Sequence, residues 1–111
     1  MDDPHEPGAE GGLAPDATAG ALLLDVRRAA AYLASPVMIA GAHWRDPAEV
    51  AHWLADLPAG QRVVAYCVHG HEVSQDTARR LRAAGLDAWH LQGGIERWQA
   101  EGRPLQPRPP G

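Results

Sequence analysis

The 111-residue chain contains one cysteine, no phenylalanine and no apolar run long enough to span a bilayer. A single cysteine cannot form a disulfide within the chain, and the N-terminus shows no charged-then-apolar leader. We therefore expect a protein of the reducing cytoplasm, where a reactive thiol stays usable. Because phenylalanine is absent, we expect core and rim packing from four tryptophans, Trp44, Trp53, Trp89 and Trp98.

The chain has no excess of positive charge, since 14 acidic residues outnumber 10 basic ones. The formal net charge is −4 and the isoelectric point lies near 5.8. This balance, without a basic stripe, argues against nucleic acid and against an anionic membrane as partners. With 45% hydrophobic and 22% charged residues, the chain can bury one core but has no room for a second domain of ordinary size.

Composition divides the chain into three parts. Residues 1–20 are rich in glycine, proline and acidic residues, and residues 106–111 are rich in proline. Such segments cannot bury enough apolar surface to order themselves, so we predict a flexible N-terminal segment at 1–20 and an extended C-terminal tail at 106–111. The folded domain is predicted at 21–105.

Strands alternate with helices within this domain. Apolar stretches predict strands at 22–26, 42–44, 62–66 and 87–91, and the third of these also has the β-branched content of a buried strand. Helical spacing predicts helices at 27–34, 46–57, 74–84 and 95–100. This alternation predicts an α/β fold in which helices cover both faces of an open parallel sheet.

The lone cysteine, Cys67, stands where the apolar run 62–66 meets a short turn that contains Gly70. The carboxyl ends of strands are where open α/β sheets bind ligands. Backbone N–H groups of a tight turn, together with the positive end of the following helix, favour a thiolate over a thiol. The position therefore indicates a nucleophile.

Four segments carry a family resemblance: LLLDVR at 22–27, IAGA at 39–42, VVAYCVHG at 63–70 and GGIERW at 93–98. In order and spacing they resemble the successive signatures of the rhodanese (sulfurtransferase) family, over residues 22–105. The resemblance implies a rhodanese-like sheet of four or five strands. The family's usual first strand and helix have no counterpart in residues 1–20, so either the sheet has four strands or an irregular segment fills its edge.

The resemblance also implies an activity. Cys67 would take a sulfane sulfur from thiosulfate or a persulfide, hold it as a persulfide, and pass it to a thiol or cyanide, with no metal or organic cofactor. The acceptor thiol could belong to a small molecule or to a protein. Asp25 and Arg27 would be framework supports near the site. The substrate-binding residues would be those of the loop after the cysteine, Val68, His69, Gly70, His71, Glu72 and Val73.

This loop departs from the family pattern in its charge. Family members that work well on thiosulfate often carry Arg or Lys here, whereas this loop has two histidines and Glu72. This loop is therefore expected to attract an anionic sulfur donor less strongly than a basic loop would.

Three alternatives remain open. Cys67, His69 and His71 form a Cys-x-His-x-His cluster that could bind zinc or copper, although no fourth ligand lies at a familiar spacing. A phosphatase or arsenate reductase would need an arginine six positions after the cysteine, where this chain has Val73. A regulatory or carrier module could keep the fold, and bind sulfur or metal or sense redox state through Cys67, without turnover.

Overall fold

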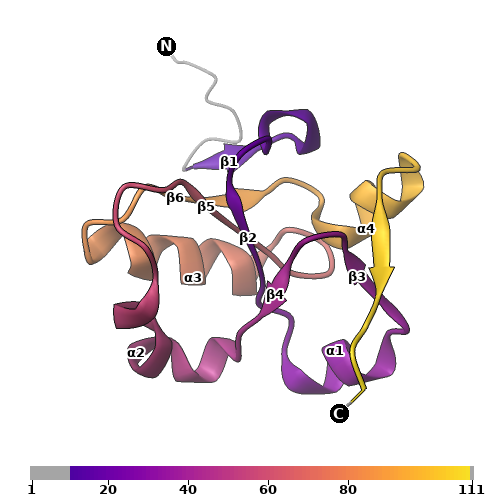
Figure 1. The fold of residues 1–111 in the computed structure, drawn as a ribbon, viewed down its shortest axis with the longest axis horizontal. Helices are drawn as coiled ribbons and strands as arrows, with labels where there is room; N and C mark the ends of the chain where they lie inside the picture. The colour runs from indigo at the N-terminus through magenta and orange to yellow at the C-terminus, as the bar shows by residue number, and fades with distance from the viewer. Residues whose placement is uncertain (1–10, 111) are drawn as a thin grey trace.

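The computed structural model describes residues 11–110. Five strands form one parallel sheet, in the order β1-β6-β5-β2-β4. The strands are β1 (Gly12–Leu13), β2 (Leu22–Asp25), β4 (His43–Trp44), β5 (Val63–Tyr66) and β6 (Ala88–Leu91). The predicted α/β class and open parallel sheet are thus confirmed, and the sheet has five strands (Figure 1).

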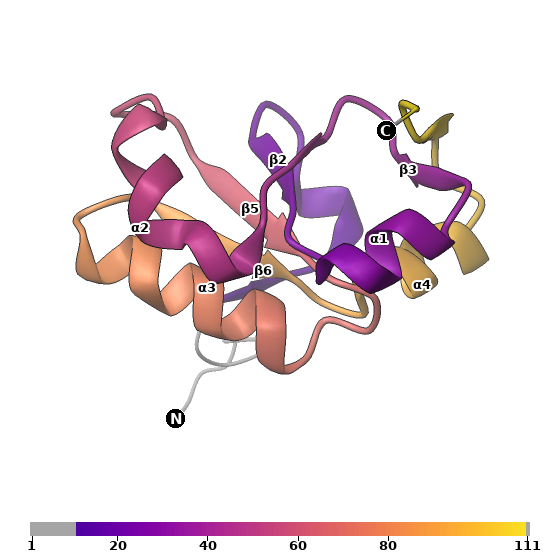
Figure 2. The ribbon, with the colours of Figure 1, turned by 90° about the horizontal axis from the view of Figure 1, so that it is seen from below.

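Helices cover both faces of this sheet. On one face, α1 (Ala29–Ala34) and α4 (Gly94–Ala100) enclose a core that includes Tyr32, Val64 and Trp98. On the other face, α2 (Val50–Trp53) and α3 (Glu72–Ala83) enclose Leu24, Val63 and Leu81. Figure 2 shows α2 and α3 together on one side and α1 and α4 on the other.

The central strand β5 explains this two-sided core. All four of its residues are buried, with Val63 and Ala65 in one cluster and Val64 and Tyr66 in the other. Successive side chains of a strand point to opposite faces, so a continuous apolar run serves both layers. This places the residue that follows Tyr66 at the centre of the carboxyl edge of the sheet.

The N-terminal prediction was wrong for residues 11–20. Strand β1 pairs with β6, and the backbone N–H groups of His90 and Gln92 donate to the carbonyls of Gly11 and Leu13 at 2.9 Å. A 3-10 helix follows at Pro15–Ala17. The edge is filled by backbone hydrogen bonds, which composition does not reveal. Residues 1–10 of the predicted flexible segment lie outside the described residues.

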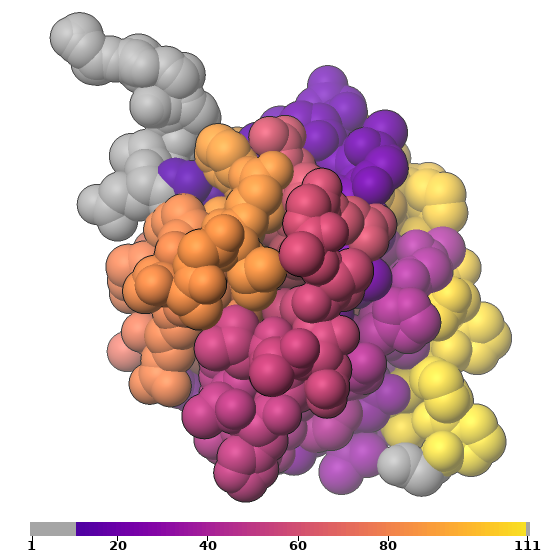
Figure 3. All heavy atoms as spheres, turned by 60° about the vertical axis from the view of Figure 1, so that its left-hand side comes forward, coloured from indigo at the N-terminus to yellow at the C-terminus, as the bar shows by residue number. Residues whose placement is uncertain are grey.

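The C-terminal prediction also needs correction. Strand β7 (Leu105–Pro107) pairs antiparallel with β3 (Val37–Ile39), so Gln106 and Pro107 belong to a second, two-stranded sheet. The Arg108 side chain then donates from Nε to the carbonyl of Ser35 at 2.8 Å. The prolines permit this because a strand on an edge does not use every N–H. In Figure 3 this C-terminal segment, yellow, lies at the right-hand edge, while the segments from α2 to β6 fill the front.

Two helix boundaries differ from prediction in ways that bear on the site. Helix α1 begins at Ala29 rather than at Arg27, whose side chain turns inward to Asp25. Helix α3 begins at Glu72 rather than at Ser74, so Glu72 and Val73 form its first turn. The segment predicted as one helix at 46–57 consists instead of the short helix α2 with a 3-10 turn on each side, Pro47–Glu49 before it and Leu54–Asp56 after it.

Candidate active site

Cys67 follows directly on β5 and lies at the carboxyl edge of the sheet. The residue is 7% exposed. Its Sγ lies 3.1 Å from the hydroxyl oxygen of Ser74, which is fully buried in the first turns of α3. As a thiol, Cys67 donates to this oxygen, and as a thiolate it would accept from the same hydroxyl. Ser74 therefore holds the sulfur in place in both protonation states.

The loop after Cys67 is packed tightly against the start of α4. Gly70 has a φ of 77°, and a Cβ at this position would lie 2.6 Å from the Gly93 nitrogen and 2.7 Å from the Leu91 oxygen. Gly94 has a φ of 59°, and a Cβ there would collide with the carbonyl oxygens of Cys67 and Val68. A positive φ and the lack of space both require glycine, so these two residues fix the loop against α4.

The start of α4 also binds the loop through hydrogen bonds. The backbone N–H groups of Ile95 and Glu96 donate to the carbonyls of Cys67 and Val68, each at 3.0 Å. On the other side, the Gln75 side chain donates to the Gly70 carbonyl at 3.0 Å. The loop carbonyls are thus occupied by donors from α3 and α4.

The backbone N–H groups of the loop, in contrast, are available. Within residues 11–110, those of residues 69–73 donate to no protein acceptor. The first N–H groups of a helix have no partner within the helix and attract anions together with the helix dipole. Because α3 starts at Glu72, the loop and this helix end form one group of donors next to Cys67 that could stabilise a negatively charged sulfur.

Cys67 lines a hollow of about 290 Å³. All the loop residues predicted as substrate-binding except Gly70 line it too, and Gly70 is instead buried against α4. The rest of the wall comes from the connection between β2 and α1 and from α1 itself. The residues of this part of the wall are Arg27, Arg28 and Ala31.

Arg28 supplies the hollow with a positive charge that the sequence of the loop did not predict. The loop has no cation, but Arg28 enters the same hollow from a different segment, is exposed, and makes no ion pair or side-chain hydrogen bond within residues 11–110. Sequence reasoning missed both Arg28 and Ser74. Ser74 was assigned only to the helix start, and no local pattern marks Arg28, because only the fold brings it next to Cys67.

A second hollow of about 700 Å³ adjoins the first. The walls of the two hollows share Arg28, Glu72 and Val73, so the hollows lie side by side. The larger one has charges of both signs in its wall. These charged residues are Arg28, Asp46, Glu72, Asp76 and Arg79.

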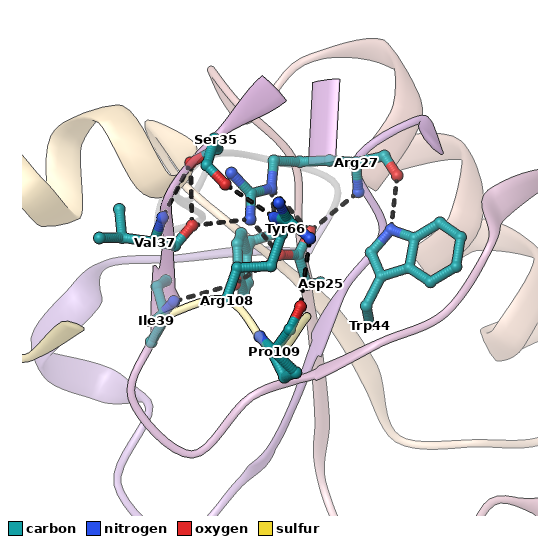
Figure 4. A network of polar contacts seen from close by, with 9 residues as sticks. All are labelled: Asp25, Arg27, Ser35, Val37, Ile39, Trp44, Tyr66, Arg108 and Pro109. Atoms are coloured by element: carbon teal, nitrogen blue, oxygen red, sulfur yellow. Dashed lines mark hydrogen bonds and ion pairs between the residues drawn. The ribbon is translucent and has the colours of Figure 1, made fainter. Parts of the chain in front are cut away.

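Asp25 and Arg27 form a buried ion pair behind the site (Figure 4). Arg27 donates from Nε to Oδ1 of Asp25 at 2.9 Å and from Nη2 to Oδ2 at 2.6 Å, and the two side chains are 2% and 0% exposed. Arg27 also donates from Nη2 to the Val37 carbonyl at 3.1 Å. The pair ties the end of β2 to β3 and supports the wall of the hollow.

Tyr66 completes this network from β5. Its hydroxyl donates to Oδ2 of Asp25 at 2.9 Å and accepts from the Ile39 backbone N–H at 3.1 Å. Burial, and secondly the negative charge of Asp25, raise the pKa of Tyr66 well above its ordinary value of 10.0. The residue directly before Cys67 is thereby held neutral and fixed.

The two loop histidines lie at the surface. Nδ1 of His69 is 2.7 Å from Oε1 of Glu96, and the ring centroids of His69 and His71 are 6.0 Å apart. Among residues 11–110, no group of three or more His, Cys, Asp or Glu side chains is arranged to hold a metal ion. None of the helices in this part of the chain is both long and apolar enough to cross a membrane.

Comparison with known proteins places this geometry in a family. The family model that describes the rhodanese-like domain matches residues 13–101 of this chain. A rhodanese-related protein from Thermoplasma volcanium has a similar structure, with 22% identity over 86% of this chain and 97% of that chain and a TM-score of 0.75. A thiosulfate sulfurtransferase from Pseudomonas aeruginosa matches with 24% identity over 87% of this chain and 19% of that chain, at a TM-score of 0.74.

A third solved structure is a protein from Rhodopseudomonas palustris described as a possible tyrosine phosphatase. It matches with 18% identity over 92% of this chain and 89% of that chain, at a TM-score of 0.73. At these identities the likeness shows the fold alone. No curated protein sequence matches the chain. Because the family model covers most of the chain, including the strand and loop that position Cys67, the chain belongs to the rhodanese-like domain family.

Proposed function

We propose that this protein is a sulfurtransferase that carries sulfane sulfur on Cys67. The observation that carries the proposal is the position of this thiol. It lies next to a hollow of about 290 Å³, 3.1 Å from a buried hydroxyl, and beside a loop whose N–H groups at residues 69–73 donate to no acceptor in the described part of the chain. Such a thiol can act as a nucleophile, and the N–H groups can stabilise the charge that forms. Sulfur relay through one free cysteine suits the reducing cytoplasm, which we take as its compartment.

The transfer proceeds in two displacements. The Cys67 thiolate attacks the outer sulfur of thiosulfate, an S–S bond forms, and the bond inside thiosulfate breaks so that sulfite leaves with its electron pair. The outer sulfur of the Cys67 persulfide then carries the negative charge, next to the N–H groups of residues 69–73. With a persulfide donor, a thiolate leaves instead of sulfite.

In the second displacement an acceptor removes the sulfur. A thiolate or cyanide bonds to the outer sulfur, the S–S bond to Cys67 breaks, and its electron pair returns to Cys67 as a thiolate. The products are a new persulfide or thiocyanate. Electrons balance in both steps, so no redox cofactor is needed.

Phosphatase chemistry is less well supported. An oxyanion held on a cysteine loop is normally gripped by a bidentate guanidinium. Val73 occupies the position where that arginine would lie. Arg27 is buried and already donates from Nε and Nη2 to Asp25 and Val37, and Arg28 enters the hollow from outside the cysteine loop. The hollow therefore favours a small sulfur compound over a phosphate ester.

Intact-protein mass spectrometry tests the proposal. After exposure to thiosulfate, polysulfide or glutathione persulfide in turn, the protein is expected to gain the mass of one sulfur atom, and cyanide or a thiol should remove it. Cys67→Ser should gain none and should lose thiosulfate:cyanide turnover while its melting temperature stays close to that of the wild type, because the side-chain volume is nearly kept. Substantial turnover by the serine variant would refute the role of Cys67. Loading without catalytic turnover would instead indicate a carrier.

A further inference from the structure

We infer that Arg108 is a positioning residue that holds helix α1 as a wall of the site and thereby limits the size of the sulfur donor that reaches Cys67. The inference rests on the proposed sulfur transfer and concerns the selectivity of the same site. Arg108 lies beyond residues 13–101, which the family model matches, so this feature belongs to the chain itself and not to the family pattern.

Helix α1 contributes to the walls of three neighbouring hollows. Ala31 lines the hollow of about 290 Å³ that contains Cys67, and Ala29 lines the larger hollow beside it. A third hollow, of about 310 Å³, is lined by Ala31 and Ala34 and shares Val68 of the cysteine loop with the first. The side chains that α1 contributes are single methyl groups, so the width of the hollows depends on where the helix backbone lies.

Helix α1 has little of its own to hold it in this position. It has six residues, and a helix this short is not stable by itself. Tyr32 is its only buried residue, whereas Leu33 is 53% exposed. Within residues 11–110 no side chain caps its N-terminus, and its last turn contains no basic residue. The position of α1 therefore depends on Tyr32 and on contacts from other segments.

Arg108 supplies such contacts from the far end of the chain. Strand β7 pairs with β3, and the Arg108 backbone N–H donates to the Pro36 carbonyl at 3.0 Å, which brings the residue to the end of α1. Its side chain donates from Nε to the Ser35 carbonyl at 2.8 Å (Figure 4) and from Nη2 to the Leu33 carbonyl at 3.4 Å. The last carbonyls of a helix lack partners within the helix, and a cation is stabilising there. Arg108 thus caps α1 from outside.

The same guanidinium also contacts the buried side chain of α1. It lies 5.4 Å from the centre of the Tyr32 ring, and the Arg27 guanidinium lies 5.5 Å from the same ring. Tyr32 in turn stacks on Trp44, with ring centroids 4.8 Å apart. Such contacts favour one position of the ring. Arg108 therefore fixes both the carbonyl end of α1 and its buried side chain, whereas within residues 11–110 it makes no hydrogen bond or ion pair with Cys67 or its loop.

The test compares small and large reagents at the same thiol. Wild-type protein and Arg108→Gln are treated with methanethiosulfonate or with the larger benzenethiosulfonate. The Cys67 thiolate bonds to the outer sulfur of either donor, and a sulfinate leaves with the electron pair. The measured quantity is the rate at which the intact protein gains one sulfur atom. A second pair, N-methylmaleimide and N-phenylmaleimide, alkylates the thiol without sulfur transfer. The ratio of variant to wild-type rates for one reagent cancels the intrinsic reactivity of that reagent.

The expected result is a change in size selectivity. Arg108→Gln should accelerate the large member of each pair by about tenfold relative to the small one, the size that the loss of one or two hydrogen bonds supports. The small reagents should react at nearly wild-type rates, because the groups that stabilise the thiolate are unchanged. Arg108→Lys keeps the cation but not the planar fork of donors and should lie in between. The pairing of β7 with β3 uses backbone groups, so both variants should fold.

Arg62→Gln is the matched control. Arg62 also contacts an aromatic ring, that of Trp89 at 5.0 Å, and it pairs with Asp87 at 3.1 Å, but it lines none of the three hollows. Its replacement removes similar contacts elsewhere on the molecule. The ratio of large to small reagent should therefore stay at the wild-type value in this variant.

Two failures are distinguishable. If thiosulfate, polysulfide and both thiosulfonates fail to load sulfur on wild-type Cys67, the proposed function is wrong. The maleimide pair tests the position of α1 independently of sulfur transfer. If Arg108→Gln leaves the ratio of large to small maleimide unchanged, or accelerates both equally, Arg108 does not set the width of the site and the inference is refuted.

Discussion

The neutral, buried hydroxyl of Tyr66 should make the protein lose stability in alkali. Its pKa is raised by burial and by Asp25, whereas in the unfolded chain it titrates near the ordinary value of about 10. Above that pH the unfolded chain releases a proton that the folded protein retains. The stabilisation from this group is therefore complete below about pH 10 and declines as the pH rises, by about 1.4 kcal/mol per unit.

The Tyr66→Phe variant isolates this effect. At neutral pH it removes a hydrogen bond to the Asp25 carboxylate and leaves the buried Ile39 N–H without its acceptor. Bonds to charged groups and unsatisfied buried donors each cost about 1–3 kcal/mol, so we expect the variant to be less stable by roughly 3 kcal/mol. Phenylalanine does not titrate, and the variant lacks the alkaline decline due to this residue.

Urea unfolding of both proteins, with reductant present, provides the assay. The difference in unfolding free energy should be about 3 kcal/mol at neutral pH and should shrink by about 1.4 kcal/mol at pH 11, because only the wild type carries the linkage. Other groups that titrate in alkali are common to both proteins and cancel. A difference that stays constant across this range would show that Tyr66 ionises in the folded protein, and the account of its network would be wrong.

Two further predictions concern the rates at Cys67. Ser74→Ala removes the hydroxyl that lies 3.1 Å from the sulfur. The variant should be slower by about tenfold at neutral pH, both in sulfur loading and in alkylation by iodoacetamide, because hydrogen bonds to charged groups contribute more than about 1 kcal/mol. Equal rates in the two proteins would mean that the hydroxyl does not stabilise the thiolate. Glu72→Lys replaces a repelling charge by an attracting one in the hollow that contains Cys67 and should raise kcat/KM for thiosulfate several-fold, with a smaller change for a neutral donor. Unchanged or weaker use of thiosulfate by the folded variant would show that loop charge does not govern donor choice.

Most of the parallel sheet could be predicted because its central strands are continuous apolar runs. Val63 to Tyr66 are all buried, and the turn after them contains the glycine that the loop requires. The predicted strand ends differ from the observed ones by one residue or less at β2, β4, β5 and β6. A buried strand between two helical layers needs apolar side chains on both faces, and this need is visible in the sequence.

The edges of the fold could not be predicted in the same way. Strand β1 has two residues and β7 has three, and both are held mainly by backbone hydrogen bonds to a partner strand. Backbone groups are the same in every residue, so such pairing leaves little trace in composition. Glycine and proline therefore suggested a flexible segment at 1–20 and an extended tail at 106–111, whereas the structure has the paired strands β1 and β7 within these regions.

The same limit applies to the site. Cys67 and the loop residues follow one another in the chain, so their proximity could be predicted. Ser74 could have been found from its spacing once the start of α3 was placed at Glu72, because that start brings the seventh residue after Cys67 back toward the sulfur. Arg28 had no such signal, since it lies far from Cys67 in the sequence and only the pairing of β2 with β5 brings the two together.

The neighbouring arginines Arg27 and Arg28 show how the connection after β2 serves two purposes. Arg27 is 2% exposed and committed to Asp25, and removing one member of such a buried pair costs about 3–5 kcal/mol. A variant at Arg27 would therefore lose activity through loss of structure. Arg28 is exposed and unpaired within residues 11–110, so its replacement changes the charge at the mouth of the hollow while the framework stays intact. Charge and stability are therefore separable at Arg28, and not at Arg27.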